Sequence, residues 1–176
     1  MKIKNIIFLL ITSILFLSIN PLDRIQKKID KEIKSTFQID SYFLKLISIE
    51  DSVSKSLPVL FNNNFKKIYS NKTLVGYSYY SKAPSLYNLF DYLIILDKNL
   101  KIKKSKILIY REDYGGEIAS KRWLSQFTGK SRTDKFIYSK DVSAISGATI
   151  SVKSMINAVE NFMSSIKILD KKNIIR

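Results

Sequence analysis

The stretch DYLIILDKNLKIKKSKILIYRED, which begins at Asp91, constrains the fold more than any other part of the sequence. Two runs rich in Leu, Ile and Tyr, residues 91–96 and 102–111, flank the turn residues Asp97-Lys98-Asn99. This arrangement predicts an antiparallel β-hairpin. Because side chains alternate along a strand, four apolar residues of the hairpin are expected on one side: Leu93, Ile95, Ile107 and Ile109.

The remaining pattern adds strands and helices on either side of this hairpin. Strands are expected in SYFLKLISI and LVGYSYYSKA, and the short run KFIYS is a candidate strand. Apolar residues at helical spacing predict helices at about 22–36, 117–127 and 151–166. The order of these elements favours an α+β fold, an antiparallel sheet with helices packed on it.

The N-terminal residues have the character of an export signal. Lys2 and Lys4 precede an apolar run from Ile6 to Ile19, which is shorter than a typical membrane span and suits a signal-peptide core. Cleavage and retention as an anchor are both open. We therefore expect a signal peptide or membrane anchor at 1–20, an amphipathic helix and lead-in at 21–66, and the main domain at 67–170. The main domain is expected outside the cytoplasm, in the cell envelope.

Composition excludes several kinds of chemistry. The 176 residues include no Cys and no His, which excludes disulfides, thiolate or imidazole metal sites and Cys/His nucleophiles. Any redox activity must then come from a bound organic cofactor. The net charge is +15, but lysine is spread over the whole chain without the arginine clusters typical of nucleic-acid sites, so no nucleic-acid partner is expected.

The turn Ser146-Gly147-Ala148-Thr149 precedes the last predicted helix. A helix N-terminus attracts phosphate, small residues allow close approach of a ligand, and the two hydroxyls can bind or be esterified by a phosphate. Taken alone, however, Thr149 is more simply read as an ordinary helix cap. A second glycine turn, Gly115-Gly116, precedes the helix expected at 117–127, with Tyr114 and Trp123 nearby as flat rings. These two turns could converge on one flat, anionic cofactor, although Trp123 alone is more often a core residue.

The two turns together resemble the FMN-binding domain of the covalent-flavin subunits of the sodium-pumping NADH:quinone oxidoreductase and the Rnf complex. The similarity lies in Ser146-Gly147-Ala148-Thr149 with the following Ile-Ser, and in a Glu-x-x-Gly turn, helix and QF-x-GK block upstream. In that family a flavin transferase joins FMN through its phosphate to the last threonine of the motif, which corresponds to Thr149. The resemblance implies that the turn is shaped by Ser146, Gly147 and Ala148. It also implies that the flavin ring is lined by Glu112, Tyr114, Gly115, Gly116 and Ile118.

Two positions depart from the family pattern. Ser143 occupies the place of a usual acidic residue six positions before the threonine, and the nearest acid is Asp141. The upstream turn commonly reads Glu-Thr-Pro-Gly-Leu-Gly, and here only its first acid, Glu112, and first glycine, Gly115, are kept. The first departure concerns covalent attachment, and the second indicates different contacts to the ring.

The expected function is that of an extracytoplasmic flavoprotein that carries electrons through FMN attached to Thr149. No residue set suggests a substrate pocket with acid and base groups, so a carrier is favoured over an enzyme. The implied partners are a flavin transferase, a redox partner protein in the membrane, and the membrane itself. The alternatives are reversible FMN binding, or a basic envelope protein that binds anionic lipid or polymer without a cofactor.

Overall fold

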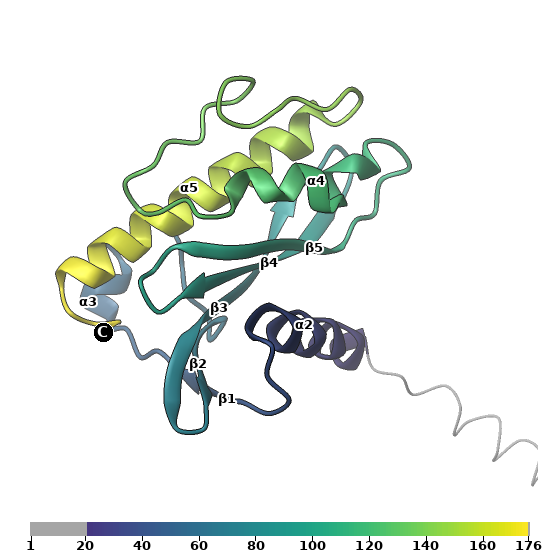
Figure 1. Ribbon diagram of the computed structural model, residues 1–176. Coiled ribbons are helices and arrows are strands. Elements are labelled where there is room, and N and C mark those ends of the chain that lie inside the picture. The colour runs from purple at the N-terminus through teal and green to yellow at the C-terminus, as the bar shows by residue number, and fades with distance from the viewer. Residues whose placement is uncertain (1–20, 176) are drawn as a thin grey trace, which may run out of the picture.

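A five-stranded antiparallel sheet forms the centre of the protein (Figure 1). The computed structural model describes residues 21–175, so the predicted signal or anchor at 1–20 lies outside the described residues. Each strand pairs with the next one in the sequence. The strands are β1 (Phe43–Leu46), β2 (Phe65–Ser70), β3 (Thr73–Pro84), β4 (Leu89–Asp97) and β5 (Ile102–Ile109). The predicted α+β class and the predicted hairpin are confirmed.

Helices cover both faces of this sheet, with α5 and α4 on one face and α2 on the other (Figure 1). The α-helices are α2 (Pro21–Phe37), α3 (Asp51–Ser54), α4 (Lys121–Leu124) and α5 (Thr149–Lys171). Two short 3₁₀ segments, η1 (Gly116–Ala119) and η2 (Ser125–Phe127), flank α4. Within residues 21–175, no helix has both the length and the apolar character needed to cross a bilayer.

Each face of the sheet has its own hydrophobic core. On the α5 face, Phe162 is fully buried and stacks on Tyr79, with ring centroids 4.3 Å apart and planes 4° from parallel. On the α2 face, Ile29 and Ile33 of the helix pack on Ile68, Leu93 and Ile95 of the strands. The lead-in helix is therefore part of the same packed unit as the sheet, and the predicted boundary between residues 66 and 67 falls inside β2.

The prediction that the four apolar hairpin residues share one side is wrong for Ile107. Leu93, Ile95 and Ile109 pack with the α2 core, whereas Ile107 belongs to the α5 core. The register explains the difference, because Asp91 pairs with Ile109 but the adjacent Tyr92 pairs with Ile107. Leu108 is therefore an extra residue in a β-bulge, and a bulge changes the side to which the following residues point.

The helical segments differ from expectation in two further ways. The helix expected at 117–127 is broken at Ser120, which has extended backbone angles and accepts a hydrogen bond from the Trp123 N–H at 3.2 Å. A serine that bonds to the backbone in this way starts a new helix instead of continuing the old one. The run KFIYS forms no strand and contributes a single bridge between Tyr138 and Val142.

Candidate functional site

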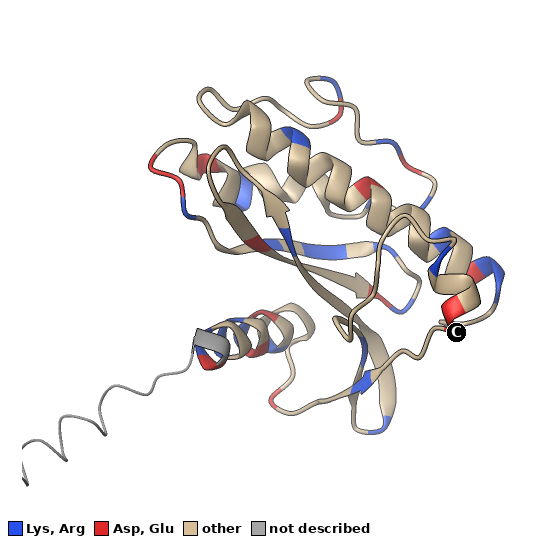
Figure 2. Cartoon of the chain, turned by 180° about the vertical axis from the view of Figure 1, so that it is seen from behind, with Lys and Arg blue, Asp and Glu red and all other residues tan. Residues whose placement is uncertain are grey.

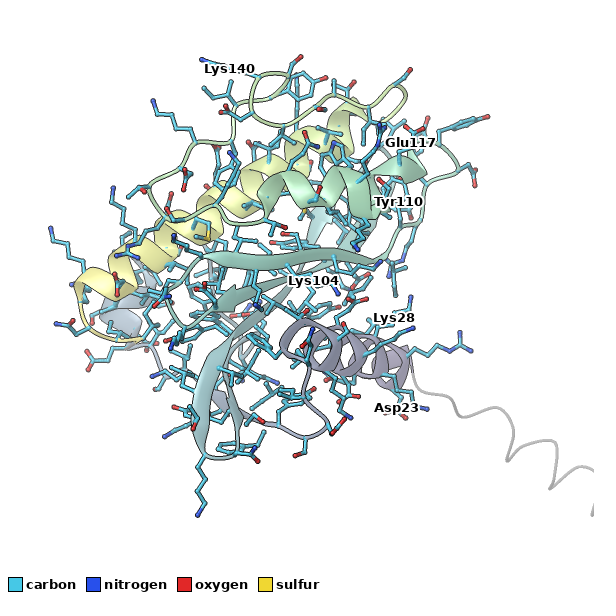
Figure 3. The ribbon with its side chains drawn as sticks, in the orientation of Figure 1. Asp23, Lys28, Lys104, Tyr110, Glu117 and Lys140 are labelled. Atoms are coloured by element: carbon cyan, nitrogen blue, oxygen red, sulfur yellow. The ribbon has the colours of Figure 1, made fainter. Side chains whose placement is uncertain are left out.

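Three segments that are distant in sequence enclose a cavity of about 280 Å³ at one end of the sheet. They are the loop between β3 and β4, the segment that leaves β5, and the first turn of α5 with the residues before it. The lining residues are Leu86, Tyr87, Tyr110, Glu112, Asp113, Tyr114, Gly147, Ala148, Thr149, Ile150 and Ser151. We call this space the Thr149 cavity. Figure 3 shows Tyr110, one of its lining residues, and Glu117 at this end of the molecule.

Thr149 is the first residue of α5, and the interpretation of it as a helix cap is wrong. The cap position belongs to Ala148, and no side chain there bonds to the helix start. The first regular helical bond runs from the Val152 N–H to the Ala148 carbonyl at 2.9 Å. The N–H groups of the first turn are thus oriented toward the cavity end of the helix, and such groups favour a bound anion. Thr149 itself is exposed, so its hydroxyl is accessible from the cavity.

The two glycine turns meet directly at Gly115 and Ala148. Gly115 has a φ of +72°, and a Cβ atom built on it would lie 2.4 Å from the Cβ atom of Ala148. Real Cβ atoms do not approach so closely, so only glycine allows this contact. Gly147 also has a positive φ, +74°, but a Cβ there would be 3.9 Å from the nearest atom, which belongs to Tyr114. The two turns therefore lie in contact, as predicted, and this contact requires glycine at position 115.

Glu112 connects the segment after β5 to the loop between β3 and β4. Its Oε1 atom accepts hydrogen bonds from the Ser85 hydroxyl at 2.5 Å and from the backbone N–H groups of Tyr87 and Asn88 at 3.0 and 2.9 Å. These bonds, first of all the one from Ser85, lower the pKa of the Glu112 carboxyl below its ordinary value. An ionised Glu112 thus holds Tyr87 at the rim of the Thr149 cavity.

Several lining residues were not anticipated from the sequence: Leu86, Tyr87, Tyr110, Asp113, Ile150 and Ser151. Tyr110 is fixed by a hydrogen bond between its hydroxyl and that of Ser151, 3.0 Å away. Tyr87 and Tyr114 are 83% and 80% exposed, which is unusual for large rings. Exposed aromatic groups around a cavity are typical of a ligand site. A tyrosine in a polar turn, as in SLYN at residues 85–88, is the one sequence signal that could have indicated this loop.

The other predicted site residues lie apart from this cavity. Ser146 lines a second cavity of about 380 Å³, together with Glu117, Ser120, Arg122, Trp123, Gln126, Ser143, Ala144 and Ile145. Gly116 is exposed and lines neither cavity. Ile118 is fully buried in the α5 core, so its assignment as a ring contact is corrected to a core residue: it follows the turn on the inner side of η1.

Trp123 and Ser143 both line the second cavity and are joined by a hydrogen bond. The indole N–H of Trp123 donates to the Ser143 carbonyl at 2.8 Å, and Trp123 is a buried core residue that does not line the Thr149 cavity. The N–H and hydroxyl of Ser143 both donate to Gln126 Oε1 at 2.8 Å. Asp141 accepts a bond from the Ile137 N–H at 2.9 Å and so stabilises a turn upstream of the motif. Serine at position 143 is thus accommodated by Gln126.

The arrangement supports binding of an anionic, planar ligand and attachment to a hydroxyl. Within residues 21–175, no group of three His, Cys, Asp or Glu side chains could hold a metal ion. The Thr149 cavity offers the hydroxyl of an exposed threonine, the N-terminal N–H groups of a long helix and three tyrosine rings. A phosphate and a flat ring system fit this combination, because the N–H groups suit the phosphate and the rings suit the plane of the flavin.

Comparison with known proteins identifies the class. Residues 90–164 match the family model of the FMN-binding domain, which confirms the resemblance drawn from the two turns. This segment extends from β4 into α5. It includes every residue that lines the Thr149 cavity except Leu86 and Tyr87, which belong to the loop between β3 and β4. The chain thus contains an FMN-binding domain, and FMN is its cofactor.

A solved structure gives a particular relative. The chain is similar to NqrC of Shewanella oneidensis, with 18% sequence identity and a TM-score of 0.50. The similarity covers 62% of this chain and 60% of that protein, so the chain spans less than two thirds of its length. At this identity the similarity concerns the fold. A search of curated protein sequences finds no significant match.

Proposed function

We propose that this protein is an electron carrier whose FMN is held in the Thr149 cavity by a phosphoester bond to the Thr149 hydroxyl. The observation that carries the proposal is the placement of Thr149 at the first position of α5, where the residue is exposed and lines the cavity. When bound, FMN supplies reversible electron transfer. The chain contains no cysteine, so it has no thiol that could carry out redox chemistry instead.

The start of α5 suits an esterified phosphate. The bond formed joins Thr149 Oγ to phosphorus, the hydroxyl proton is released, and the flavin must arrive with a leaving group on its phosphate. A flavin transferase is the partner that supplies it in this form. The remaining phosphate charge then lies at the end of a 23-residue helix, where the helix dipole stabilises a negative charge. Gly147, which has no side chain and only Tyr114 nearby, leaves room for the phosphate to approach the backbone.

The tyrosines of the cavity are suited to hold the ring. Tyr110 is oriented by the hydrogen bond between its hydroxyl and that of Ser151. Tyr87 is held in place by the hydrogen bond that its backbone N–H donates to the Glu112 carboxylate. Tyr114 is exposed on the opposite turn and is the predicted stacking partner. Offset contact between aromatic planes adds about 0.5–1.5 kcal/mol beyond the burial of the ring surface. These side chains position a flavin ring and shield it from water; they offer no acid or base pair for a substrate.

Location and partners follow from the sequence. The apolar run from Ile6 to Ile19 after Lys2 and Lys4 supports export or anchoring with the domain outside the cytoplasm. A covalent bond has a clear advantage there, since a dissociated FMN is not easily replaced outside the cytoplasm. The electrons are exchanged with a redox partner protein in the membrane.

Covalent attachment is tested by producing the protein together with a flavin transferase and denaturing it. The peptide that contains Thr149 is expected to gain the mass of FMN less one water. Thr149→Ala is expected to lose all covalent flavin, whereas Thr128→Ala, at an exposed threonine outside the cavity, keeps it. A wild-type peptide without added mass would refute the attachment. A Thr149→Ala protein that still purifies with yellow colour would instead support reversible binding.

A further inference from the structure

The exposed surface of α2 divides into a basic flank and an acidic flank. Arg24, Lys28, Lys31 and Ser35 are spaced so that they form one stripe along the helix. This stripe faces β5, because the Lys104 ammonium contacts both Ser35, at 3.3 Å, and Glu32, at 2.5 Å. The Lys28 ammonium donates to the Leu108 carbonyl of β5 at 2.6 Å.

The acidic residues Asp23 and Asp30 lie one heptad apart on the other flank. Asp30 pairs with Lys34 at 3.1 Å and also interacts with Tyr42, on the β1 side of the helix. Its charge contributes to the rise of the Tyr42 pKa to about 12, mainly caused by burial. Asp23 and Asp30, with the paired Lys34, therefore lie on the side of α2 away from β5, and the basic stripe lies next to β5 with Glu32 as its acidic neighbour.

Strand β5 extends the positive flank with three lysines. Lys106 pairs with Leu93 and Lys104 with Ile95, and both of these partners face the α2 core. Paired residues point to the same face of a sheet, so both lysines lie on the side of α2. Lys103 lies over the ring of Phe37, at the end of α2, with its ammonium 5.8 Å from the ring centroid.

We call this continuous surface the α2/β5 basic surface; it consists of Arg24, Lys27, Lys28, Lys31, Lys103, Lys104 and Lys106. Among the acids of α2 only Glu32 lies within it, and Glu32 is already paired with Lys104. Figure 2 shows Lys and Arg segments along α2, and Figure 3 shows Lys28 and Lys104 where α2 meets β5. Seven cations around one paired acid give this surface a net positive charge.

We propose that the α2/β5 basic surface docks on the anionic headgroups of a lipid membrane. The apolar run that ends at Ile19 is separated from the start of α2 by a single residue, Asn20. Any bilayer that holds this run therefore lies close to Arg24 and Lys27. Lysines and arginines directly beside a membrane segment are attracted to anionic lipid, each by about fivefold in the binding constant. The proposal concerns a surface away from the Thr149 cavity and does not depend on flavin.

The absence of cysteine allows a direct test with the full chain. A single Ser35→Cys variant places a polarity-sensitive fluorophore within the basic stripe of α2, and Ser164→Cys places the same probe on an exposed position of α5. Both proteins are reconstituted in vesicles of phosphatidylcholine, with or without phosphatidylglycerol. We expect the emission at position 35 to rise and shift to the blue only in the anionic vesicles, and to return in high salt. The emission at position 164 should not change.

Charge removal gives the matched control. One variant replaces four lysines of the basic surface by Gln: Lys27, Lys31, Lys103 and Lys106. The control variant replaces four exposed lysines elsewhere by Gln, so that both variants lose the same charge: Lys121, Lys135, Lys140 and Lys167. The first variant should lose the anionic-lipid response at position 35 by tenfold or more, and the second should keep it. An equal response in neutral vesicles, no response, or an equal loss in both variants would overturn the proposal. Flavin attachment at Thr149 is measured separately, so the two proposals fail independently.

Discussion

The contact between Gly115 and Ala148 allows a sharp test of how the Thr149 cavity is built. In Gly115→Ala, the new Cβ meets the Ala148 Cβ at 2.4 Å and the Ala148 Cα at 3.1 Å, and neither atom can rotate away. The backbone also holds residue 115 at a φ of +72°, which costs an alanine about 1–2 kcal/mol. Overpacking adds about 1–3 kcal/mol, so we expect the free energy of unfolding to fall by about 2–5 kcal/mol.

Urea denaturation of the flavin-free protein measures this loss, and Gly116→Ala is its control. Gly116 has no heavy atom within 4 Å of a built Cβ and no positive φ, so its replacement should change stability by less than about 0.5 kcal/mol. The double variant Gly115→Ala/Ala148→Gly removes the clash but keeps the backbone strain, so it should recover the overpacking part only. Equal losses at positions 115 and 116, or no recovery in the double variant, would refute the reasoning. Covalent flavin yield is expected to follow the same order, because the clash separates Thr149 from Tyr114.

Three further outcomes follow from other contacts. Hydrogen bonds lower the pKa of Glu112, so its bond to the Tyr87 N–H is intact above that pKa and is lost as the pH falls through it. Hydrogen exchange at the Tyr87 amide, measured relative to amides in β4, should therefore accelerate only at a pH below the ordinary range of a glutamate carboxyl. Phe162→Ala should cost about 3–5 kcal/mol in urea denaturation, because the ring is fully buried in the α5 core; a loss below about 1 kcal/mol would contradict this. Arg111→Met should cost about 2 kcal/mol or more, since it removes the cation 2.6 Å from Oδ2 of the buried Asp91 and leaves Tyr80 as the close partner, on Oδ1. Lys82→Met, at 3.9 Å from Asp91 and half-exposed, should cost less than about 1 kcal/mol.

The elements that the sequence predicted well have a strong local signal. The hairpin around Asp97-Lys98-Asn99 is visible because the turn and both apolar runs are adjacent in the chain. The side to which Ile107 points was not visible, because a single bulge residue changes it without any change in composition. The break in the helix at Ser120 was not visible either. A helical pattern of apolar residues does not reveal whether a serine side chain will accept a hydrogen bond from the backbone.

The site was predictable where it lies in motifs and not where it lies in tertiary contacts. The glycine turns and Thr149 stood out as short patterns, and the structure places both turns in contact. Tyr87 was missed because its position at the cavity depends on Glu112, which is 25 residues away in the sequence. Ile118 was misassigned because proximity to a turn in the sequence does not fix whether a side chain points inward.

The Thr149 cavity is formed by segments that are far apart in the sequence, and this affects whether folding or flavin loading comes first. Its walls are joined by bonds between residues 27 positions apart, Ser85 and Glu112, and 41 positions apart, Tyr110 and Ser151. The second bond cannot form until the start of α5, which contains Ser151, has emerged and packed beside Tyr110. A nascent polypeptide that has not yet folded therefore lacks the pocket even when it already displays Thr149. Cofactor loading is then a maturation step that follows folding, and a misfolded chain would be left without its flavin.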